Sequence, residues 1–512
     1  MKTKRTRREF LKITGKSMLT LTASPFILDF LAKNSELCFA EDTSELPVLK
    51  QSVTKNVIEK ALDIALSNGA DFADIYLERT VKRTIELSES RIKNIRYSID
   101  IGAGIRVLYG ESTGYAYCED LTESSILKAA KLSANLGKSD NHIEPEELIR
   151  CQLKNNILTQ TIPLTSVSED KRIQAMRKAE EAARAYNNKI SNVSIDYYDE
   201  FKQISIANSE GNFVDDIQPI VYFKVNALAI NNGNRHMGRT RFSGKCGFEI
   251  FDQNKPEDSG RMAAEEAIRM LKAKDSPSGE MPVVVNGGWG GVLFHEAVGH
   301  GLEADGVAKG NSYFAGRIGE RVASDIVTFI DDASIPNLRG SFNFDDEGTP
   351  SQRKVLIDKG ILKRFMTDIL SSRKLNTVST GNGRRESFRY SPMVRMTNTF
   401  ILAGKSKPDD IIADTKKGLF AKSFDGGVVD TTTGNFTFTV REAYLIEDGK
   451  LTSPVKRATL IGKGADALSS IDMVADDLGF GSGTCGKGQW VPVTSGQPTL
   501  RLSKIVVGGT KS

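Results

Sequence analysis

The chain has 512 residues, of which 39% are hydrophobic and 26% charged, so it is long enough for two or more domains and has an ordinary globular composition. Its formal net charge of +4 arises at the N-terminus, because residues 1–40 hold eight Lys/Arg and three Asp/Glu, and the remainder is nearly neutral. A neutral body argues against nucleic acid or an anionic membrane as the partner.

The first 40 residues are predicted to be a targeting segment. A basic start precedes a moderately apolar middle, and residues 38–40 offer a small-residue cleavage site. The run TRREFLK, residues 6–12, resembles the consensus of bacterial twin-arginine signals, which export folded proteins. Pro25 and Asp29 interrupt an apolar stretch that is too short to span a membrane. We therefore expect export to the bacterial periplasm or cell envelope with only transient membrane contact; the alternative is an uncleaved tether.

Residues 50–275 are expected to form an N-terminal domain of helices and antiparallel strands. Thr54 would cap an amphipathic helix that Asn68–Gly69 ends. Residues 72–117 alternate apolar and polar side chains between Gly and Ser turns, which is typical of an antiparallel meander. Within it, IGAGI (101–105) favours a hairpin bend over a phosphate-binding loop. Further helices are expected over 121–136, 170–186 and 261–271, and further strands over 190–230.

The polar, turn-forming stretch 274–280 is a plausible domain boundary. Residues 281–512 then form a second domain, rich in glycine and β-branched residues, with a hairpin signal over 436–451. This domain should be mostly strand. The predicted fold is therefore α+β with two domains.

Five cysteines, Cys38, Cys118, Cys151, Cys246 and Cys485, are too few and too scattered for a disulfide framework. Export would permit disulfides, but folding before export takes place in a reducing compartment. Their spacing assigns no pair.

The segment HEAVGH, residues 295–300, holds two of the chain's four histidines. In H-E-x-x-H, histidines four apart share a zinc ion on one helical face and the glutamate is the base. Here His295 and His300 are five apart, which on an ideal helix separates the rings by about 140°. Two ordinary helical histidines are the alternative, but Glu296 and the surrounding glycines favour a metal site. We expect either a π-type bulge or a helix that ends after Val298, with Gly299 turning the chain back.

A catalytic zinc ion needs a third protein ligand and leaves a fourth position to water. Glu303 and Asp305 lie near in sequence. Cys485 lies in GSGTCGKG, where glycines allow a close approach and Lys487 would favour the thiolate. The residues alone leave this choice open.

Three segments together resemble the TldD/PmbA metallopeptidases, and specifically the TldD side, which keeps H-E-x-x-x-H. They are GGVLFHEAVGHGLEAD (290–305), YSPMVRMTNTF (390–400) and GSGTCGKGQ (481–489), and residues 94–117 also resemble the family. By this resemblance His295, His300 and Cys485 are the zinc ligands and Glu296 is the catalytic glutamate.

The resemblance implies a dimeric, two-domain zinc metallopeptidase that cleaves peptides or unfolded segments. The partner would be a second copy or a related subunit. The better known members are cytoplasmic, so the signal segment leaves the substrate and the partner open. Extended peptides would bind by strand addition to an exposed sheet edge. The alternative is a non-catalytic peptide-binding or assembly subunit with a structural metal; Glu296 favours the peptidase, since a structural zinc site has no need of that acid.

The arginine-rich run GNGRRESFRYSPMVRM is expected to contact the substrate. Arg384, Arg385, Arg389, Arg395 or Tyr390 would donate to the oxyanion or bind a substrate carboxylate, and of these Arg384, Arg385 and Tyr390 are the predicted substrate-binding residues. A solvated face is the alternative for at least two of the arginines.

Overall fold

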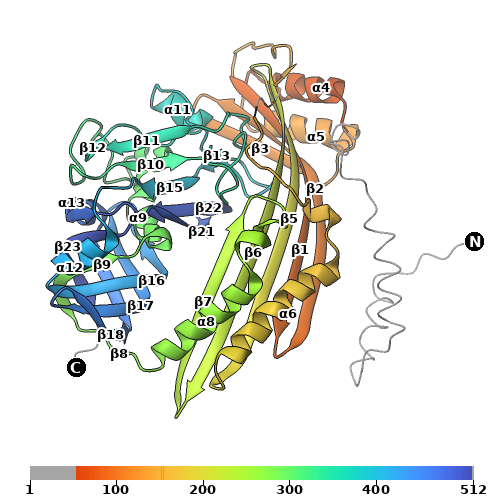
Figure 1. Ribbon diagram of the computed structural model, residues 1–512. Helices are drawn as coiled ribbons and strands as arrows, with labels where there is room; N and C mark the ends of the chain where they lie inside the picture. The colour runs from red at the N-terminus through yellow and green to blue at the C-terminus, as the bar shows by residue number, and fades with distance from the viewer. Residues whose placement is uncertain (1–52, 152, 154, 510–512) are drawn as a thin grey trace, which may run out of the picture. The chain divides into compact units, whose positions relative to one another are not determined.

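The computed structural model describes residues 53–151, 153 and 155–509 (Figure 1). The expected signal segment, residues 1–40, and Cys38 lie outside the described residues. No helix within the described ranges is long and apolar enough to cross a membrane. The architecture is α+β, as the sequence predicts. Cys118, Cys246 and Cys485 are free thiols.

Strands between residues 72 and 244 form one sheet that is antiparallel except where β4 joins β6. The strand order is β3-β2-β1-β5-β6, and β7 also pairs with β6. The predicted meander is confirmed in β1, β2 and β3. The strands are β1 (Phe72–Ser88), β2 (Arg91–Tyr109), β3 (Ser112–Cys118), β4 (Ile149–Arg150), β5 (Ile190–Asn208), β6 (Asn212–Asn231) and β7 (Asn234–Gly244).

Helices cover the apolar face of this sheet. In Figure 1, α4 and α5 lie at one end of the long strands, and α6 and α8 lie along them toward the other end. All four were expected from sequence, but α8 begins earlier than predicted because Pro256 occupies its first turn with Glu257 and Asp258. The helices are α4 (Lys55–Leu66), α5 (Glu123–Ala134), α6 (Glu169–Tyr186), α7 (Ile250–Gln253) and α8 (Pro256–Met270), with a 3₁₀ turn, η1 (Leu164–Ser166).

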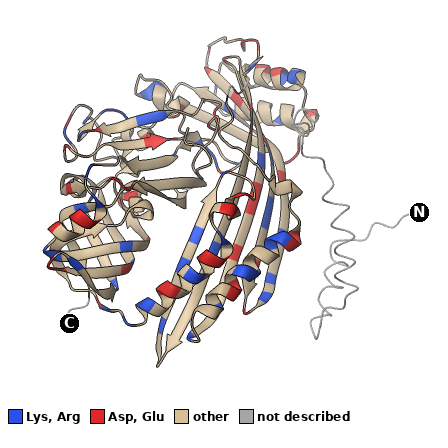
Figure 2. Ribbon diagram, in the orientation of Figure 1, with Lys and Arg blue, Asp and Glu red and all other residues tan. Residues whose placement is uncertain are grey.

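The opposite face of the sheet is buried and polar. Alternate residues of β1, among them Asp74 and Glu78, are almost fully buried there. They contact residues 384–391, which we call the arginine loop: Arg385 lies 3.4 Å from Asp74, and the Phe388 N–H donates to Glu78. Figure 2 shows basic and acidic residues intermixed along these strands and along α6 and α8.

The expected bend over residues 101–105 is wrong, because β2 runs straight through this segment. A Cβ atom at Gly102 would lie 2.4 Å from the Phe388 ring, and one at Gly104 would lie 2.6 Å from the Phe388 carbonyl oxygen. The glycines therefore admit the arginine loop against the sheet instead of turning the chain.

The rest of the chain is mostly strand, as predicted. Strands β16, β9, β23, β19 and β17 pair in that order, and the pairing of β16 with β17 closes them into a barrel. Strands β18, β8 and β20 extend it. The expected hairpin is confirmed in β17 and β18, which turn at Asp448–Gly449. The bounds are β8 (Lys274–Asp275), β9 (Gly279–Val285), β16 (Lys417–Val429), β17 (Asn435–Glu447), β18 (Lys450–Lys456), β19 (Ala458–Lys463), β20 (Ile471–Val474) and β23 (Leu500–Gly508).

A second sheet, of order β12-β11-β10-β15-β22-β21, lies beside the barrel (Figure 1). Its last strand, β21, pairs only with β22 among the described strands. The bounds are β10 (Phe329–Asp332), β11 (Arg353–Asp358), β12 (Ile361–Leu362), β15 (Asn398–Ile401), β21 (Gly479–Gly486) and β22 (Trp490–Gln497), with a separate ribbon of β13 (Gly383–Arg384) and β14 (Met393–Val394).

The helix α9 (Val292–Ala297) packs against β16 and β17 of the barrel and against β15 and β22 of the second sheet. Its side chains are buried, except for that of Glu296. The approach is close, since a Cβ atom at Gly291 would lie 2.6 Å from the backbone of Gly496 in β22. The remaining short helices are α10 (Ala304–Val307), α11 (Ile369–Lys374), α12 (Pro408–Asp414) and α13 (Gly464–Ser469), and the 3₁₀ turns are η2 (Gly288–Gly291) and η3 (Gly299–Leu302).

Candidate metal centre

The two histidines of HEAVGH lie on separate short helices. The α-helix α9 ends at Ala297, Val298 leaves the helical conformation with φ −129° and ψ −49°, and the 3₁₀ turn η3 follows. Of the two expected geometries, the helix end is therefore the one observed. The His295 and His300 ring centroids lie 5.6 Å apart at 80°.

Gly299 does not turn the chain as the sequence predicts. Its φ is not positive, so it does not supply a left-handed turn. A Cβ atom there would instead lie 2.2 Å from the Met396 sulfur. The glycine lets η3 pack against Met396, and the change of direction occurs at Val298.

Cys485 joins the two histidines from β21. Candidate ligand atoms of His295, His300 and Cys485 all lie within 4.8 Å of one another. The Cys485 Sγ is 3.2 Å from the His300 Nε2, although the residues are 185 apart in sequence. The structure thus brings together the three residues that the resemblance names as ligands.

The hydrogen bonds of the two imidazole rings occupy their Nδ1 atoms and leave the Nε2 atoms to bind a metal. The His295 Nδ1 is bonded to the Thr399 hydroxyl at 2.9 Å, and the His300 Nδ1 to the Glu303 carboxylate at 2.9 Å. The His295 Nε2 is buried and has no hydrogen-bond partner among the described residues. Two imidazole nitrogens and one thiolate are donors that zinc prefers, and outer partners on Nδ1 are typical of zinc-binding histidines. The residues therefore fit a zinc ion with one open position.

Electrostatics keep Cys485 in the form that binds metals. Burial raises the pKa of the thiol, but the adjoining His300 and His295 outweigh it and hold that pKa well below its ordinary value. For His300 burial lowers the pKa, whereas Glu303 and Cys485 raise it to a net value well above the ordinary one.

The nearby acids that competed as third ligands form an outer layer. Glu303 bonds His300 and lies 2.9 Å from the Lys487 ammonium, and Asp305 lies 2.8 Å from the same ammonium. Burial raises the pKa of Glu303, but Lys487 and His300 lower it to a net value below the ordinary range. Lys487 was expected to act on Cys485, but its ammonium bonds these two carboxylates and the Val394 carbonyl.

Two residues have positioning roles that the sequence did not predict. Thr399 orients His295, and the buried Arg395 donates to the Cys485 carbonyl at 2.6 Å and to the Gln489 carbonyl at 2.7 Å. Both lie inside YSPMVRMTNTF, the second segment of the family resemblance, where Thr399 had no predicted role and Arg395 was a candidate for substrate contact.

Glu296 faces an open pocket beside the cluster. Its carboxylate is 3.5 Å from the His300 Nε2, and its side chain is 25% exposed. The pocket has a volume of about 560 Å³ and is bordered by β16 on one side and by the β21–β22 hairpin on the other, at Val428 and Trp490 respectively. A carboxylate at the edge of a metal cluster and open to a pocket can exchange a proton with a bound substrate.

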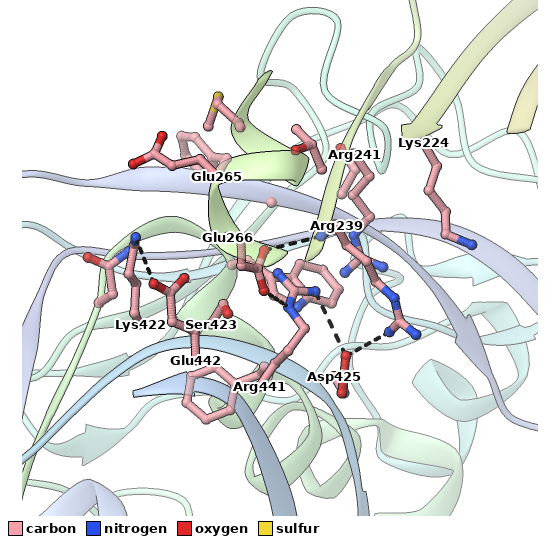
Figure 3. Close-up of a pocket in the computed structure, with 18 of the residues that line it drawn as sticks. Lys224, Arg239, Arg241, Glu265, Glu266, Lys422, Ser423, Asp425, Arg441 and Glu442 are labelled. Atoms are coloured by element: carbon pink, nitrogen blue, oxygen red, sulfur yellow. Dashed lines mark hydrogen bonds and ion pairs between the residues drawn. The ribbon is translucent and has the colours of Figure 1, made fainter. Parts of the chain in front are cut away.

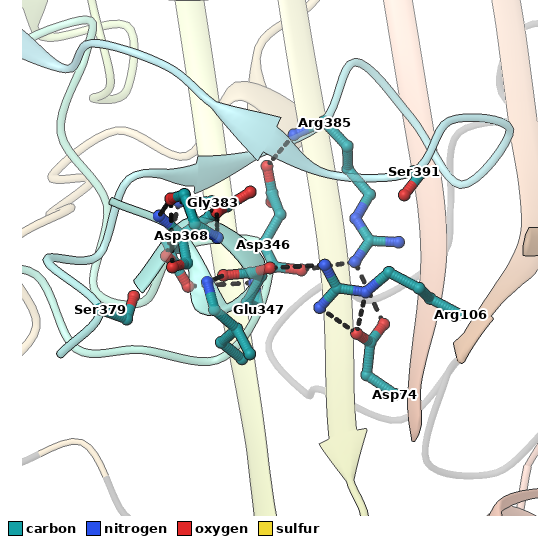
Figure 4. A network of polar contacts seen from close by, with 12 residues as sticks. Asp74, Arg106, Asp346, Glu347, Asp368, Ser379, Gly383, Arg385 and Ser391 are labelled. Atoms are coloured by element: carbon teal, nitrogen blue, oxygen red, sulfur yellow. Dashed lines mark hydrogen bonds and ion pairs between the residues drawn. The ribbon is translucent and has the colours of Figure 1, made fainter. Parts of the chain in front are cut away.

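The predicted substrate-binding residues lie elsewhere. Arg384 and Arg385 are buried, and neither they nor Tyr390 line this pocket. Arg384 donates to the Met396 carbonyl, and Arg385 donates to the Asp346 carbonyl at 2.7 Å beside Asp74 (Figure 4). They fix the arginine loop between the sheet and the metal-bearing region. Their role in substrate binding stays a prediction that no contact supports.

The alternative of a solvated face for at least two of these arginines is wrong. Arg384, Arg385 and Arg395 are each at most 3% exposed, whereas Arg389 is partly exposed and pairs with Glu119 at 3.0 Å.

Comparison with known protein families gives consecutive matches along the chain. Residues 73–137 match the PmbA/TldA metallopeptidase domain 1, residues 162–271 the central domain, and residues 278–509 the C-terminal domain.

Individual proteins agree with these matches. A "Metalloprotease TldD homolog" of Haemophilus influenzae is 42% identical over 460 residues, which cover 88% of this chain and 95% of that protein. A "Zinc metalloprotease TldD homolog" of Saccharolobus solfataricus is 28% identical over 453 residues, covering 86% and 97%. The crystal structure of TldE from Thermococcus kodakarensis shares the fold, with a TM-score of 0.73, 19% identity, and coverage of 88% of this chain and 100% of that one.

Proposed function

The chain belongs to the PmbA/TldA metallopeptidase family, and from that premise we propose that it is a zinc-dependent peptidase that hydrolyses extended or unfolded peptides. One observation carries the proposal. The donor atoms of His295, His300 and Cys485 converge within 4.8 Å, and Glu296 stands between this cluster and an open pocket.

The proposed roles follow from this geometry. His295, His300 and Cys485 would hold the metal, and zinc, when bound, supplies a Lewis acid that polarises a carbonyl and acidifies water. Glu296 accepts a proton from the attacking water and later donates it to the leaving amine. The Thr399 and Glu303 bonds to the two Nδ1 atoms keep both rings oriented.

The pocket suits an extended chain. Strand β16 pairs with β9 only over Leu419–Ala421, so its far end, Asp425–Val429, has β17 as its one strand partner in the described part of the chain. Gly427, Val428 and Val429 of that end line the pocket. A peptide could add as a strand to this edge, which gives affinity through main-chain bonds and little side-chain specificity.

Replacing Glu296 by Gln tests the peptidase function, because it keeps the side-chain shape and removes the proton acceptor. We expect zinc content and fold to persist and peptide hydrolysis to fall by about 10² to 10⁴. The assay uses a mixture of unstructured peptides with products identified by mass spectrometry. Glu320→Gln, which changes an exposed carboxylate, should leave hydrolysis unchanged.

Wild-type protein that cleaves nothing, or a Glu296→Gln variant that cleaves as well as wild type, would contradict the proposal. The same assay on protein recovered from its native host includes any partner subunit. Failure there too would favour the alternative, a peptide-binding or assembly subunit with a structural metal.

We further propose that the protein is exported and works as a dimer, with a second copy or with a related subunit. The Arg7–Arg8 pair in a basic leader supports export, and cell fractionation of a variant with both arginines replaced by lysine checks it. The fold shared with TldE supports a related partner.

A further inference from the structure

A second polar cavity, of about 510 Å³, lies where β6, β7 and α8 meet β16, β17 and β21 (Figure 3). We call it the Arg241 cavity. Most of its charges neutralise one another: every lysine and arginine that lines it, other than Arg241, has a carboxylate partner within 3.2 Å. Figure 3 shows Arg239 paired with Asp425 and Arg441 paired with Glu266, each at 2.8 Å.

Arg241 is different. Its guanidinium stacks on the Trp289 ring, with the central carbon 3.9 Å from the ring centroid, and no carboxylate pairs with it among the residues that the structure describes. Partial burial lowers the pKa of Arg241, Tyr222 raises it, and the cationic Arg441, Arg339 and Arg239 bring it to a net value below the ordinary one. A planar cation held on an aromatic face, with cations around it and no counter-charge, is preorganised for a bidentate anion such as a carboxylate.

Two other lining residues have unused hydrogen-bonding capacity. The Trp289 Nε1 and the Ser423 hydroxyl are buried and have no hydrogen-bond partner in the described part of the chain. Both groups can donate to an acceptor oxygen. Unsatisfied donors of this kind favour a ligand that carries acceptor oxygens.

The Arg241 cavity and the pocket at Glu296 lie at neighbouring positions along β21. An intermediate hollow of about 490 Å³ shares Arg241 and Ser482 with the cavity and Thr484 with the Glu296 pocket. Strand β21 borders the cavity, the intermediate hollow and the Glu296 pocket, and β16 borders the cavity and the Glu296 pocket. β21 runs from Gly481 in the cavity to Cys485 at the metal centre. Four residues of strand span about 13 Å.

We propose that Arg241 binds a carboxylate of the peptide substrate, either an acidic side chain or the C-terminus, about four residues from the scissile bond. The spacing is set by the four-residue stretch of β21 from Gly481 in the Arg241 cavity to Cys485 at the metal centre. This inference rests on the proposed peptidase function. It assigns a charge preference to a site whose strand addition alone would give little specificity.

Paired peptides test the preference. Each pair differs only in Asp against Asn at one position, scanned from two to six residues on either side of the cleaved bond, or in a free against an amidated C-terminus. Binding is measured by fluorescence anisotropy in the Glu296→Gln background, which leaves the peptide uncut, and cleavage is measured as kcat/KM in the wild-type background. We expect the carboxylate peptide to be favoured about tenfold or more at one position, as for a charge-assisted hydrogen bond.

Arg241→Gln should abolish the preference, mainly through Kd and KM. Arg241→Lys keeps the charge without the bidentate fork and should retain only part of the preference. Arg235→Gln removes an exposed arginine from the same strand, β7, outside the cavity, and should retain all of it. Weaker binding of the Asn peptide identifies a side-chain carboxylate as the ligand of Arg241. Weaker binding of the amidated peptide identifies the C-terminus.

The two proposals fail in different ways. A preference that survives in Arg241→Gln, no preference in any pair, or no measurable peptide binding overturns the role of Arg241. Cleavage that depends on Glu296 without any charge preference overturns it too, and leaves the peptidase function standing. Binding with an Arg241-dependent preference, but without cleavage, supports the carboxylate site and overturns the peptidase function.

Discussion

Two buried charged regions of this protein, the metal centre and the Arg106 network, satisfy their charges in opposite ways. In the network, named for Arg106 of β2, the guanidinium is 2.6 Å from the Glu347 carboxylate and also pairs with Asp74 (Figure 4). In the metal centre, donor atoms of His295, His300 and Cys485 point at one another, and the His295 Nε2 has no partner among the described residues.

The difference separates structure from chemistry. A buried cation facing buried carboxylates of the same chain is complete, and removing one partner leaves an uncompensated charge. At the metal centre, lone pairs of the three ligand residues converge with too few protons between them to form hydrogen bonds. A metal cation bound from outside satisfies them. Damage to the Arg106 network should therefore appear in stability, and damage to the metal centre in metal content and activity.

The largest effect is expected at the metal centre. Cys485→Ala should reduce bound zinc from about one ion per chain to near none, because two histidines alone leave the ion without its thiolate. Metal analysis after gel filtration measures this. Cys118→Ala, which removes a free thiol elsewhere, should keep its zinc. If Cys485→Ala bound zinc as tightly as wild type, Glu303 or Asp305 would become the candidate third ligand.

A smaller effect, confined to stability, is expected in the Arg106 network. Arg106→Met keeps much of the side-chain volume but leaves Glu347 buried without its cation and Asp74 with only Arg385, at 3.4 Å, so the free energy of unfolding should fall by about 3–5 kcal/mol. Urea titration measures it. Arg96→Met, on an exposed part of the same strand, should change stability by about 0.5 kcal/mol or less.

Zinc content connects these two experiments. The Arg106→Met protein should keep its zinc at temperatures where it is folded, because Arg106 is not among the residues that surround the cluster. Zinc loss from folded Arg106→Met protein would mean that the two regions are not independent.

Local patterns predicted local structure well. The alternation over residues 72–117 gave β1 to β3, and the hairpin signal over 436–451 gave β17 and β18, because strand period and turn chemistry act between near neighbours. Long-range pairing was not predictable in this way. The pairings of β9 with β16 and with β23 in the barrel, and the place of β21 at a sheet edge, depend on packing between segments far apart in sequence.

In the candidate site, too, the local part was predictable from sequence and the long-range part was not. HEAVGH indicates a metal site by itself. Cys485 lies 185 residues beyond His300, and only the family resemblance predicts it as a ligand. The arginine run was expected at the substrate or in solvent. Arg385 is instead buried against Asp74, 311 residues away, and a single sequence contains no sign of such a distant carboxylate. Charged residues at a buried face are the places where composition misleads, because burial there depends on partners that are remote.

A pH dependence of opposite sign is expected in the two regions. Burial, with added repulsion from Asp368 and Asp345, raises the pKa of Glu347 to about 8 against the lowering effect of Arg106, and burial raises that of Asp345 to about 7. The unfolded values are about 4.3 and 3.9. Because the folded state holds more protons than the unfolded state between these limits, stability from the Arg106 network is present at about pH 5 and is lost as the pH rises toward about 8, by at most about 1.4 kcal/mol per pH unit for each proton.

Zinc binding releases protons from its ligands and so adds stability as the pH rises, which would mask this slope. The titration therefore uses Cys485→Ala protein, with urea midpoints measured from pH 5.5 to 8.5. Adding Glu347→Gln should flatten the fall, and adding Glu320→Gln should not. A stability that instead rises with pH in the zinc-free protein would show that Glu347 is ionised in the fold, held so by Arg106.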